Sequence, residues 1–443
     1  MNVYLKENFL LGVASAATQI EGGEWNHTWN DWYHKGKILD GSNPARANQH
    51  YEKYLEDIKL MQEMKIQTYR FGVEWARIQP NENEFVEEVI AHYRSLIQEL
   101  NTAGIKPLLT LHHFTNPLWF EEKGGFTKEE NIKFFLNFVK RMVLELGDLV
   151  EEYVTINEVN IYATQGFYSG NWPPAMKSPQ MTLKVMSVMA TAHIQAYQLI
   201  HEIRQQQQFQ NWERTKVGYA NHLRVFKPKN KWNPKHQICK MISERFFQGA
   251  LSKAMSLGQF TFPLKNICNL PQGEYSDFIG INYYSKTTVT GLSDGVASQV
   301  PVNDLGWEIY PEGIVECARD QYKLLKRPIY ITENGTCDND DRFRIRFIYE
   351  HLKAMTDSDL PFERYYHWCF TDNFEWLEGE SARFGLVHVN YETQERTVKM
   401  SGRFFTKMIE AKGVSKWMYE TDVEQIQYDY NKKVRKERIR KEN

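Results

Sequence analysis

Two glutamates occupy positions where a carboxyl group can take part in chemistry. Glu158 directly follows the mostly apolar run Tyr153–Asn157, and Glu333 directly follows Ile329–Thr332. Side chains at the carboxyl ends of barrel strands converge on one mouth of the barrel. Two carboxyl groups there could cleave a glycosidic bond, one as a protonated acid and the other as an ionised nucleophile or base. A single glutamate after a strand is more often a solvated loop residue, so spacing alone does not establish this chemistry.

The elements that must position these glutamates alternate along the chain. Eight short, nearly continuous apolar runs predict strands buried on both faces. Amphipathic segments such as His50–Met64, with Leu55, Ile58 and Met61 on its predicted apolar face, and Val185–Ile200 lie between them. The predicted strands are Phe9–Ala14, Tyr69–Val73, Pro107–Leu111, Tyr153–Ile156, Lys216–Ala220, Phe278–Asn282, Ile329–Thr332 and Tyr365–Phe370.

This alternation favours the α/β class and a single closed (β/α)8 TIM barrel with elaborated loops. A doubly wound sheet would require a glycine-rich phosphate turn after an early strand, which is not visible. We interpret Phe226–Pro234 and Gly291–Leu305 as long loops that follow strands. We expect the barrel to span residues 1–430, and the basic segment 431–443 to be a solvated helix or frayed tail, with a partner-binding arm as the alternative.

Composition excludes several classes of protein. A formal net charge of -2 argues against a nucleic-acid or membrane-surface partner. No run of about 18 apolar residues predicts a transmembrane helix. The aromatic content of 14% favours carbohydrate binding without proving it, because aromatic rings also fill cores.

Five cysteines, odd in number and without a CxxC pair, argue against a disulfide framework and favour a reducing, cytoplasmic location. Phe9–Ala17 is apolar like a short signal peptide, but it continues into Gln19–Gly22 and is better explained as a first strand. His112 and His113 are adjacent and would point to opposite faces of a strand, so they do not indicate a metal site. We expect no metal and no cofactor, and the oligomeric state is left open.

Several motifs, in order along nearly the whole chain, resemble those of glycoside hydrolase family 1, the β-glucosidase family. Thr155–Glu158 is similar to the acid/base motif of that family, and Tyr330–Gly335 is similar to its nucleophile motif. Further blocks resemble the family at Phe9–Ala14, Gln19–Gly22, His50–Ile58, Tyr69–Phe71, Trp75–Pro80, Thr110–Phe114, Asn282–Tyr284, Gly306–Pro311, Trp368–Trp376 and Arg383–Leu386.

The resemblance implies a role for each matching position. Glu158 would be the acid/base and Glu333 the nucleophile, while Trp307 would line the leaving-group side. The positions implied to bind or stack on the sugar are Gln19, His113, Asn157, Trp368, Glu375 and Trp376, and those implied to surround Glu333 are Arg70, Asn282 and Tyr284. Taken singly, most of these residues would be ordinary core or ion-pair residues; their joint occurrence supports the functional interpretation.

These roles carry electrostatic expectations. Arg70 and a hydrogen bond from Tyr284 should favour the ionised form of Glu333 and lower its pKa. Repulsion from Glu333, about 5 Å away in a retaining enzyme, should keep Glu158 protonated until Glu333 is glycosylated. Asn157 should offer a donor to the sugar 2-hydroxyl, and Glu375 should accept from two adjacent hydroxyls.

The pattern departs from the family at a few positions. Val159 stands where proline is usual, and Phe114 and Thr115 replace a tryptophan and an acidic residue or proline. Members that act on 6-phosphorylated sugars carry lysine and tyrosine where this chain has Ala382 and Phe384. Glu378 and Glu380 lie nearby and would repel a phosphate, which favours non-phosphorylated substrates.

The resemblance therefore implies a retaining exo-β-glycosidase acting on small β-glycosides or oligosaccharides, chiefly β-D-glucosides, with β-galactosides and β-fucosides as further candidates. Three alternatives stay open. The same intermediate would serve a transglycosylase, the substrates could be 6-phospho-β-glycosides, or the chain could be a non-catalytic carbohydrate-binding relative. Both glutamates are present, which argues against the last.

Overall fold

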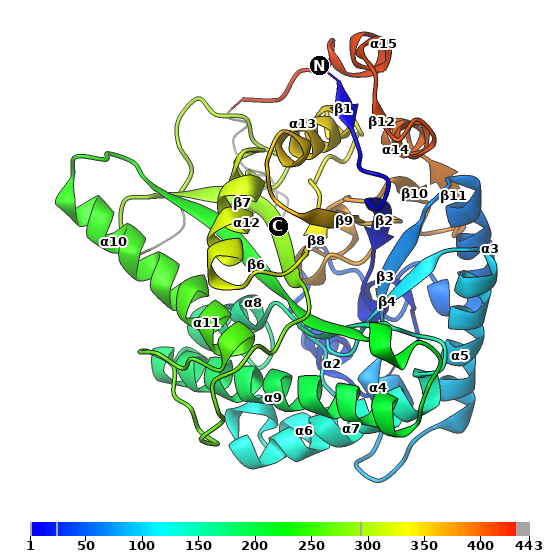
Figure 1. Ribbon diagram of the computed structural model, residues 1–443, viewed down its shortest axis with the longest axis vertical. Helices are drawn as coiled ribbons and strands as arrows, with labels where there is room; N and C mark the ends of the chain where they lie inside the picture. Colours follow the sequence, from blue (N-terminus) through cyan, green and yellow to red (C-terminus); the bar gives the residue numbers. More distant parts are fainter. Residues whose placement is uncertain (1, 24, 293–294, 431–443) are drawn as a thin grey trace.

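A closed barrel of eight parallel strands forms the centre of the molecule (Figure 1). The computed structural model describes residues 2–23, 25–292 and 295–430. The first strand of the barrel pairs with the last, from Leu10 opposite Arg364 to Ala14 opposite Trp368, which closes the sheet. The strands are β2 (Leu10–Ala14), β3 (Thr68–Gly72), β4 (Lys106–Thr110), β5 (Glu152–Asn157), β6 (Lys216–Pro228), β7 (Ile279–Val289), β8 (Ile329–Asn334) and β9 (Phe362–Trp368). The predicted α/β class and (β/α)8 architecture are confirmed.

All eight predicted strands are present, but β6 and β7 are longer than expected. They remain paired as far as Pro228 opposite Val289, beyond a register shift at Leu223 and Val225. The interpretation of Phe226–Pro234 as a loop was therefore wrong for its first three residues. Arg224 and Lys227 interrupt the apolar run, because this extension pairs only with its neighbour and needs no burial on both faces.

Helices surround the barrel as the alternation of segments predicted. His50–Met64 corresponds to α3, and Val185–Ile200 lies inside a much longer α9. In α3, Ile58 and Met61 are buried as expected, whereas Leu55 is 54% exposed and lies off the core face. The longer surrounding helices are α3 (His50–Glu63), α5 (Glu87–Thr102), α7 (Ile132–Leu146), α9 (Pro179–Gln206), α10 (Pro234–Glu244), α11 (Ala250–Leu257), α12 (Gly313–Leu324), α13 (Arg344–Thr356) and α14 (Met400–Glu410).

Shorter elements fill the loops. The helical ones are α1 (Ala17–Ile20), α2 (Thr28–His34), α4 (Trp75–Ile78), α6 (Leu118–Glu122), α8 (Val159–Ala163), α15 (Lys416–Met418), and turns at Gly125–Thr127, Glu129–Asn131, Thr164–Ser169, Trp212–Arg214, Arg245–Gly249, Trp376–Ser381 and Tyr419–Val423. Two antiparallel pairs lie outside the barrel: β1 (Val3–Tyr4) with β12 (Gly413–Val414), and β10 (Val387–Val389) with β11 (Arg396–Val398).

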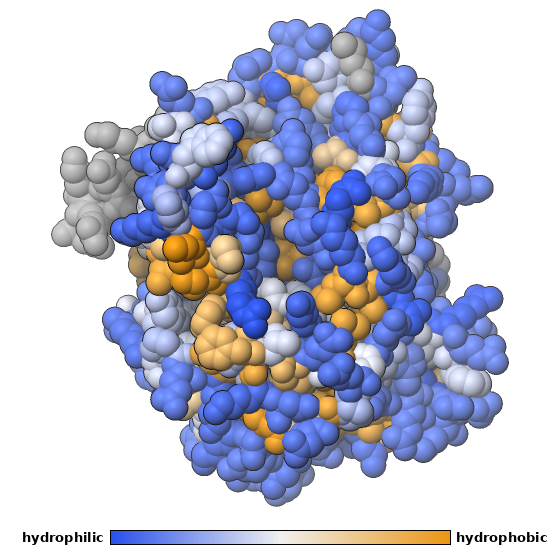
Figure 2. Space-filling model, turned by 60° about the vertical axis from the view of Figure 1, so that its left-hand side comes forward, coloured by the Kyte–Doolittle hydropathy of each residue, from blue (hydrophilic) through white to orange (hydrophobic). Residues whose placement is uncertain are grey.

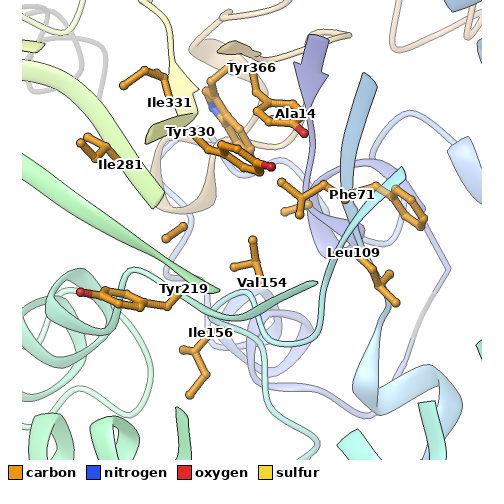
Figure 3. Close-up of a cluster of buried hydrophobic side chains, with 14 of the residues drawn as sticks. Ala14, Phe71, Leu109, Val154, Ile156, Tyr219, Ile281, Tyr330, Ile331 and Tyr366 are labelled. Carbon is orange, nitrogen blue, oxygen red and sulfur yellow. The ribbon is translucent and has the colours of Figure 1, made fainter. Parts of the chain in front are cut away.

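The interior of the barrel is packed with side chains. In Figure 3, the buried side chains of Val154 and Tyr330 point into the barrel, whereas those of Leu109, Ile281 and Ile331 point outward, towards the surrounding helices. Inward-pointing side chains make a barrel a solid core and leave its carboxyl-end mouth as the place for a binding site. Among the described residues, no helix combines the length and apolar composition needed to cross a bilayer. The predicted tail, residues 431–443, lies outside the described residues, and the domain boundary at 430 stays a prediction.

Candidate active site

The two glutamates lie at the carboxyl ends of β5 and β8, and both are buried. Glu158 directly follows β5 and begins α8, and its backbone adopts the left-handed region with φ of 43°. Glu333 is the penultimate residue of β8 and lies opposite Asn282 of β7. Their side chains are 7% and 4% exposed. A non-glycine residue with positive φ is uncommon and is held there by its surroundings, which aims Glu158 away from the regular strand direction.

A buried hydrogen-bond network joins the two glutamates. Arg70, fully buried on β3, donates to Glu333 Oε1 at 2.5 Å and to Asn157 Oδ1 at 2.7 Å. Asn282 donates to the same Asn157 oxygen at 3.0 Å and to Glu158 Oε1 at 2.8 Å. Asn282 was expected to support Glu333. Its Oδ1 accepts from the Thr332 hydroxyl at 2.6 Å, which leaves its amide N–H groups to donate to Asn157 and Glu158. Every member of the network has a partner, so it holds its geometry without a ligand.

Glu333 has the partners of an ionised carboxylate but a raised pKa. Burial raises the pKa of Glu333 to about 7; Arg70 lowers it, the charge of Glu158 raises it, and the hydrogen bond from Tyr284 lowers it. The expected net lowering was therefore wrong, since burial outweighs the guanidinium. Tyr284 donates to Glu333 Oε2 at 2.5 Å. Burial, with the charge of Glu333, holds the pKa of Tyr284 well above its usual value, so this hydroxyl stays a donor.

Sequence reasoning missed two residues beside Glu158. His222 and Arg224 lie on the extended part of β6, and the His222 ring contacts Glu158 Oε1 at 3.1 Å through Nδ1. Arg224 lies 3.2 Å from the other ring nitrogen, Nε2. A guanidinium can only donate, so Nε2 must accept and the ring proton must lie on Nδ1, facing Glu158. The contact between His222 and Glu158 depends on how far β6 extends. The sequence alone did not show that His222 belongs to this strand.

Two residues near the glutamates, Gln19 and His113, carry buried polar atoms without hydrogen-bond partners among the described residues. Gln19 donates to the Phe374 carbonyl at 2.8 Å and to Glu375 at 3.3 Å, while its Oε1 is buried without a partner among the described residues. His113 accepts from Asn157 at 3.0 Å through Nε2, which leaves its Nδ1 buried and similarly unpaired. The Asn157 amide carries two N–H groups and His113 takes one, so the other stays available for the sugar, as expected. A ligand hydroxyl would supply the partner that each of these two atoms lacks.

Glu375 and His113 have opposite pKa shifts with one main cause. Burial raises the pKa of Glu375 to about 8; the charge of Glu333 adds to this, while hydrogen bonds from Trp368 and Gln19 oppose it. Burial, with the charge of Arg70, holds the pKa of His113 well below its usual value. His113 is therefore a neutral donor at Nδ1, and Glu375 is easily kept neutral as well. Both groups can hydrogen-bond an uncharged ligand at little electrostatic cost.

Aromatic rings pack around His113. The rings of Trp368 and Trp376 each lie nearly parallel to the His113 ring, with centroids 5.8 Å away and a tilt of 22°. Phe114 packs edge-on against Trp376 at 5.2 Å. Trp368 and Trp376 are almost completely buried, so they also belong to the core. Flat apolar faces beside polar hydroxyl-binding groups are what a sugar ring requires.

On the other side of the glutamates, Trp307 remains 37% exposed. Its ring contacts Tyr284 at 5.9 Å and the buried Phe384 at 6.0 Å. Glu380, expected to repel a phosphate, forms an ion pair with Arg46, so its charge is largely compensated. The expectation of non-phosphorylated substrates therefore rests on Ala382 and Phe384 more than on the charge of Glu380.

The family model for glycosyl hydrolase family 1 matches residues 1–414. The chain belongs to this family. It is 28% identical to β-glucosidase A of Thermotoga maritima, over 92% of this chain and 98% of that protein. It is also 28% identical to the β-galactosidase of Pyrococcus woesei, over 94% and 98% of the two chains.

Solved structures agree. The β-glycosidase from Pyrococcus horikoshii matches with a TM-score of 0.84 at 32% identity, covering 95% of this chain and 98% of that one. The β-glucosidase from Thermotoga maritima in complex with glucoimidazole matches with a TM-score of 0.84 at 27% identity, covering 93% and 100%. The protein is thus an enzyme, an O-glycosyl hydrolase of the β-glucosidase type, and family membership predicted from the motifs is confirmed.

Proposed function

We propose that this protein hydrolyses terminal, non-phosphorylated β-D-glucosides with retention, using Glu333 as nucleophile and Glu158 as acid/base. The observation that carries the proposal is the contrast between two linked, buried glutamates. Glu333 is bound by a guanidinium and a phenol, which stabilise a carboxylate. Glu158 Oε1 is bound instead by the neutral amide of Asn282 and by the His222 ring.

In the first step, Glu333 attacks the anomeric carbon while the bond to the leaving oxygen breaks. Glu158 transfers its proton to that oxygen, so the leaving group departs neutral. Because Asn282 and His222 both donate to Oε1 of Glu158, the transferable proton belongs on Oε2. The product of this step is a glycosyl ester of Glu333, and its formation removes the negative charge of Glu333.

In the second step, water attacks the anomeric carbon from the side of the departed group. Glu158, now ionised, takes a proton from this water, and the ester bond to Glu333 breaks. Two inversions restore the original β configuration. The sugar hydroxyls would be held during both steps by Gln19, His113, Asn157, Glu375 and Trp376. Trp368 would lie beneath the ring and Trp307 beside the leaving group.

The role of Glu333 is tested by chemical rescue. Activity of Glu333→Gly on a nitrophenyl β-glucoside should fall by at least about 10³-fold, since the covalent route is lost. Added azide should restore turnover and give an α-glucosyl azide, because a single displacement inverts configuration. A β-configured product would contradict the assignment. Glu363→Gly, at the partly buried Glu363 near the opposite end of β9, serves as a control.

The role of Glu158 is tested by the leaving group. Glu158→Gln should reduce kcat/KM strongly for alkyl glucosides, whose leaving oxygen needs a proton, and far less for dinitrophenyl glucoside. A plot of log kcat/KM against leaving-group pKa should therefore be steeper than for the unaltered enzyme. Equal losses on both substrates would remove the acid role from Glu158. Running the same series with galactosides, fucosides and a 6-phosphoglucoside fixes the sugar preference.

A further inference from the structure

A stripe of apolar side chains on α10 faces solvent. Ile238, Met241 and Ile242 are 56%, 66% and 39% exposed, and their i, i+3, i+4 spacing places them on one helix face. Trp232, just before the helix, is 82% exposed, and Phe262 is 73% exposed. Phe262 packs edge-on against Phe246, which lies in the turn after α10. These five exposed residues, Trp232, Ile238, Met241, Ile242 and Phe262, are called the α10 surface below.

The α10 surface is surrounded by positive charge. Residues 227–249 contain six lysines and arginines and a single acidic residue, Glu244, in a chain whose formal net charge is -2. Two of the six cations form ion pairs: Lys240 with Glu244, and Lys227 with Glu316 of α12. Lys229, Lys231, Lys235 and Arg245 are exposed. The near-neutral total charge, which argued against a membrane-surface partner, thus conceals a strongly basic region.

The loop before α10 is held in a conformation that presents Trp232 outward. Asn230 Oδ1 accepts from the Trp232 backbone N–H at 2.9 Å, and Gln237 donates to the Lys231 carbonyl at 2.7 Å. The Lys231 ammonium lies 5.1 Å from the centroid of the Trp232 ring. These contacts hold the loop in a conformation that keeps the Trp232 side chain exposed.

The position and chemistry of this surface favour a bilayer as its occupant. In Figure 1, α10 lies at the outer edge of the molecule, and Figure 2 shows orange side chains among blue ones on this side. Apolar side chains flanked by lysines match an interface where acyl chains meet anionic headgroups. A second copy docked through the same surface would bring two strongly basic regions together, which repel each other.

The turn after α10 contacts the residues beside Glu158. The turn Arg245–Gly249 continues α10, and its Phe247 contacts the His222 ring at 5.9 Å and the Arg224 guanidinium at 4.6 Å. His222 in turn contacts Glu158. The α10 surface is therefore connected to the side of the site from which the leaving group departs.

We propose that the α10 surface docks this enzyme on an anionic lipid bilayer and that its substrates include β-glycosides whose aglycone is a membrane lipid. The substrate class rests on the proposed function, whereas the docking does not. Docked in this way, the pocket would receive a sugar headgroup while the lipid leaving group stays in the bilayer.

Vesicle binding tests the docking directly. The full chain should sediment with vesicles of 70% phosphatidylcholine and 30% phosphatidylglycerol at 50 mM NaCl, and at least tenfold more weakly with pure phosphatidylcholine or at 500 mM NaCl. The triple variant Trp232→Ser, Ile238→Ser, Met241→Ser and the double variant Lys229→Glu, Lys231→Glu should each reduce binding at least tenfold. Trp417→Ser, on the similarly exposed Trp417 of α15, is the matched control and should bind normally.

Two outcomes would overturn the docking. One is equal vesicle binding by the triple variant and the unaltered chain, or no binding by either. The other is a stable dimer by light scattering that the triple variant converts to monomer, which would make a second copy the occupant. Unchanged activity of the triple variant on a soluble nitrophenyl β-glucoside shows that it is folded.

The substrate class has its own readout. On a β-glucosyl diacylglycerol in the same anionic vesicles, the triple variant should be at least fivefold slower than the unaltered enzyme. Hydrolysis of the nitrophenyl glucoside without vesicle binding would leave the proposed function standing and overturn this inference. Vesicle binding without hydrolysis of any glycoside would overturn the proposed function and the lipid substrates, and would leave the docking standing. Binding with hydrolysis of the soluble substrate alone would remove the lipid aglycone.

Discussion

At the residue scale, His222 is positioned to orient the acid/base group. Because Arg224 fixes the ring proton on Nδ1, His222 has a donor aimed at Glu158 Oε1. His222→Phe should lower kcat/KM about tenfold on alkyl glucosides, which equals about 1.4 kcal/mol, and less on dinitrophenyl glucoside. His222→Asn places an amide N–H near the former Nδ1 and should recover most of this loss. Equal losses in both variants would reduce His222 to a packing residue.

Glu375 makes stability depend on pH in a direction opposite to an ion-paired carboxylate. Its pKa rises from 4.5 to about 8 in the folded protein, so the folded state binds this proton more tightly than the unfolded state. The stability from that proton is fully present below about pH 4.5 and is lost as pH rises towards 8. Glu375→Gln should therefore gain Tm relative to the unaltered enzyme as pH rises from 5 to 9, while losing sugar binding.

Thermal unfolding at pH 5, 7 and 9 measures this difference. The exposed Glu392, changed to glutamine, provides a control of the same chemistry away from the site. A Tm difference for Glu375→Gln that stays constant across this range would contradict the argument. A gain in stability together with a loss in kcat/KM would show that the site trades stability for function.

At the scale of elements, the site depends on how closely the ends of neighbouring strands approach. A Cβ on Gly335, two residues after Glu333, would lie 1.9 Å from the Trp368 carbonyl oxygen. This oxygen belongs to the backbone and can move only if β9 moves with it. Gly335→Ala should therefore destabilise the fold by about 2 kcal/mol and lower kcat by displacing β8 from β9. Gly291→Ala, where nothing lies within 4 Å, is the matched control. Urea unfolding and kcat on a nitrophenyl glucoside measure both effects.

The sequence predicted these elements unevenly. Apolar runs such as Ile329–Thr332 gave all eight strands, because a strand buried on both faces has a continuous apolar signal. The β6 extension was missed because it pairs on one side only and carries Arg224 and Lys227. His222 was missed with it, since a contact across strands depends on register, which one sequence does not encode visibly.

The same contrast holds among the site residues. Family motifs located Glu158, Glu333 and Arg70, whose positions follow from strand ends. They also named Asn282, but they did not predict that its amide bonds Glu158 while its Oδ1 accepts from Thr332. The net pKa of Glu333 was also mispredicted, because burial is a property of the assembled pocket and outweighs a single neighbouring charge.

At the scale of the whole molecule, the net charge does not describe the local charge of the surface. The formal total is -2, yet residues 227–249 hold six cationic side chains and one acidic one. Electrostatic attraction to a surface depends on the local field within about 8 Å at physiological salt, not on the total. A protein can therefore be nearly neutral and still have one face with a preferred partner.

Closure of the barrel also has a consequence for synthesis on the ribosome. The barrel closes between β2 and β9. Ala14 therefore cannot pair until Trp368 has been synthesised, 354 residues later. Until then the nascent chain has an open sheet with two unpaired edges, and Glu158 emerges long before the strand that carries Glu333. Any translation product that stops short of β9 would lack this closure, and its exposed edges would make it a substrate for chaperones or a seed for aggregation.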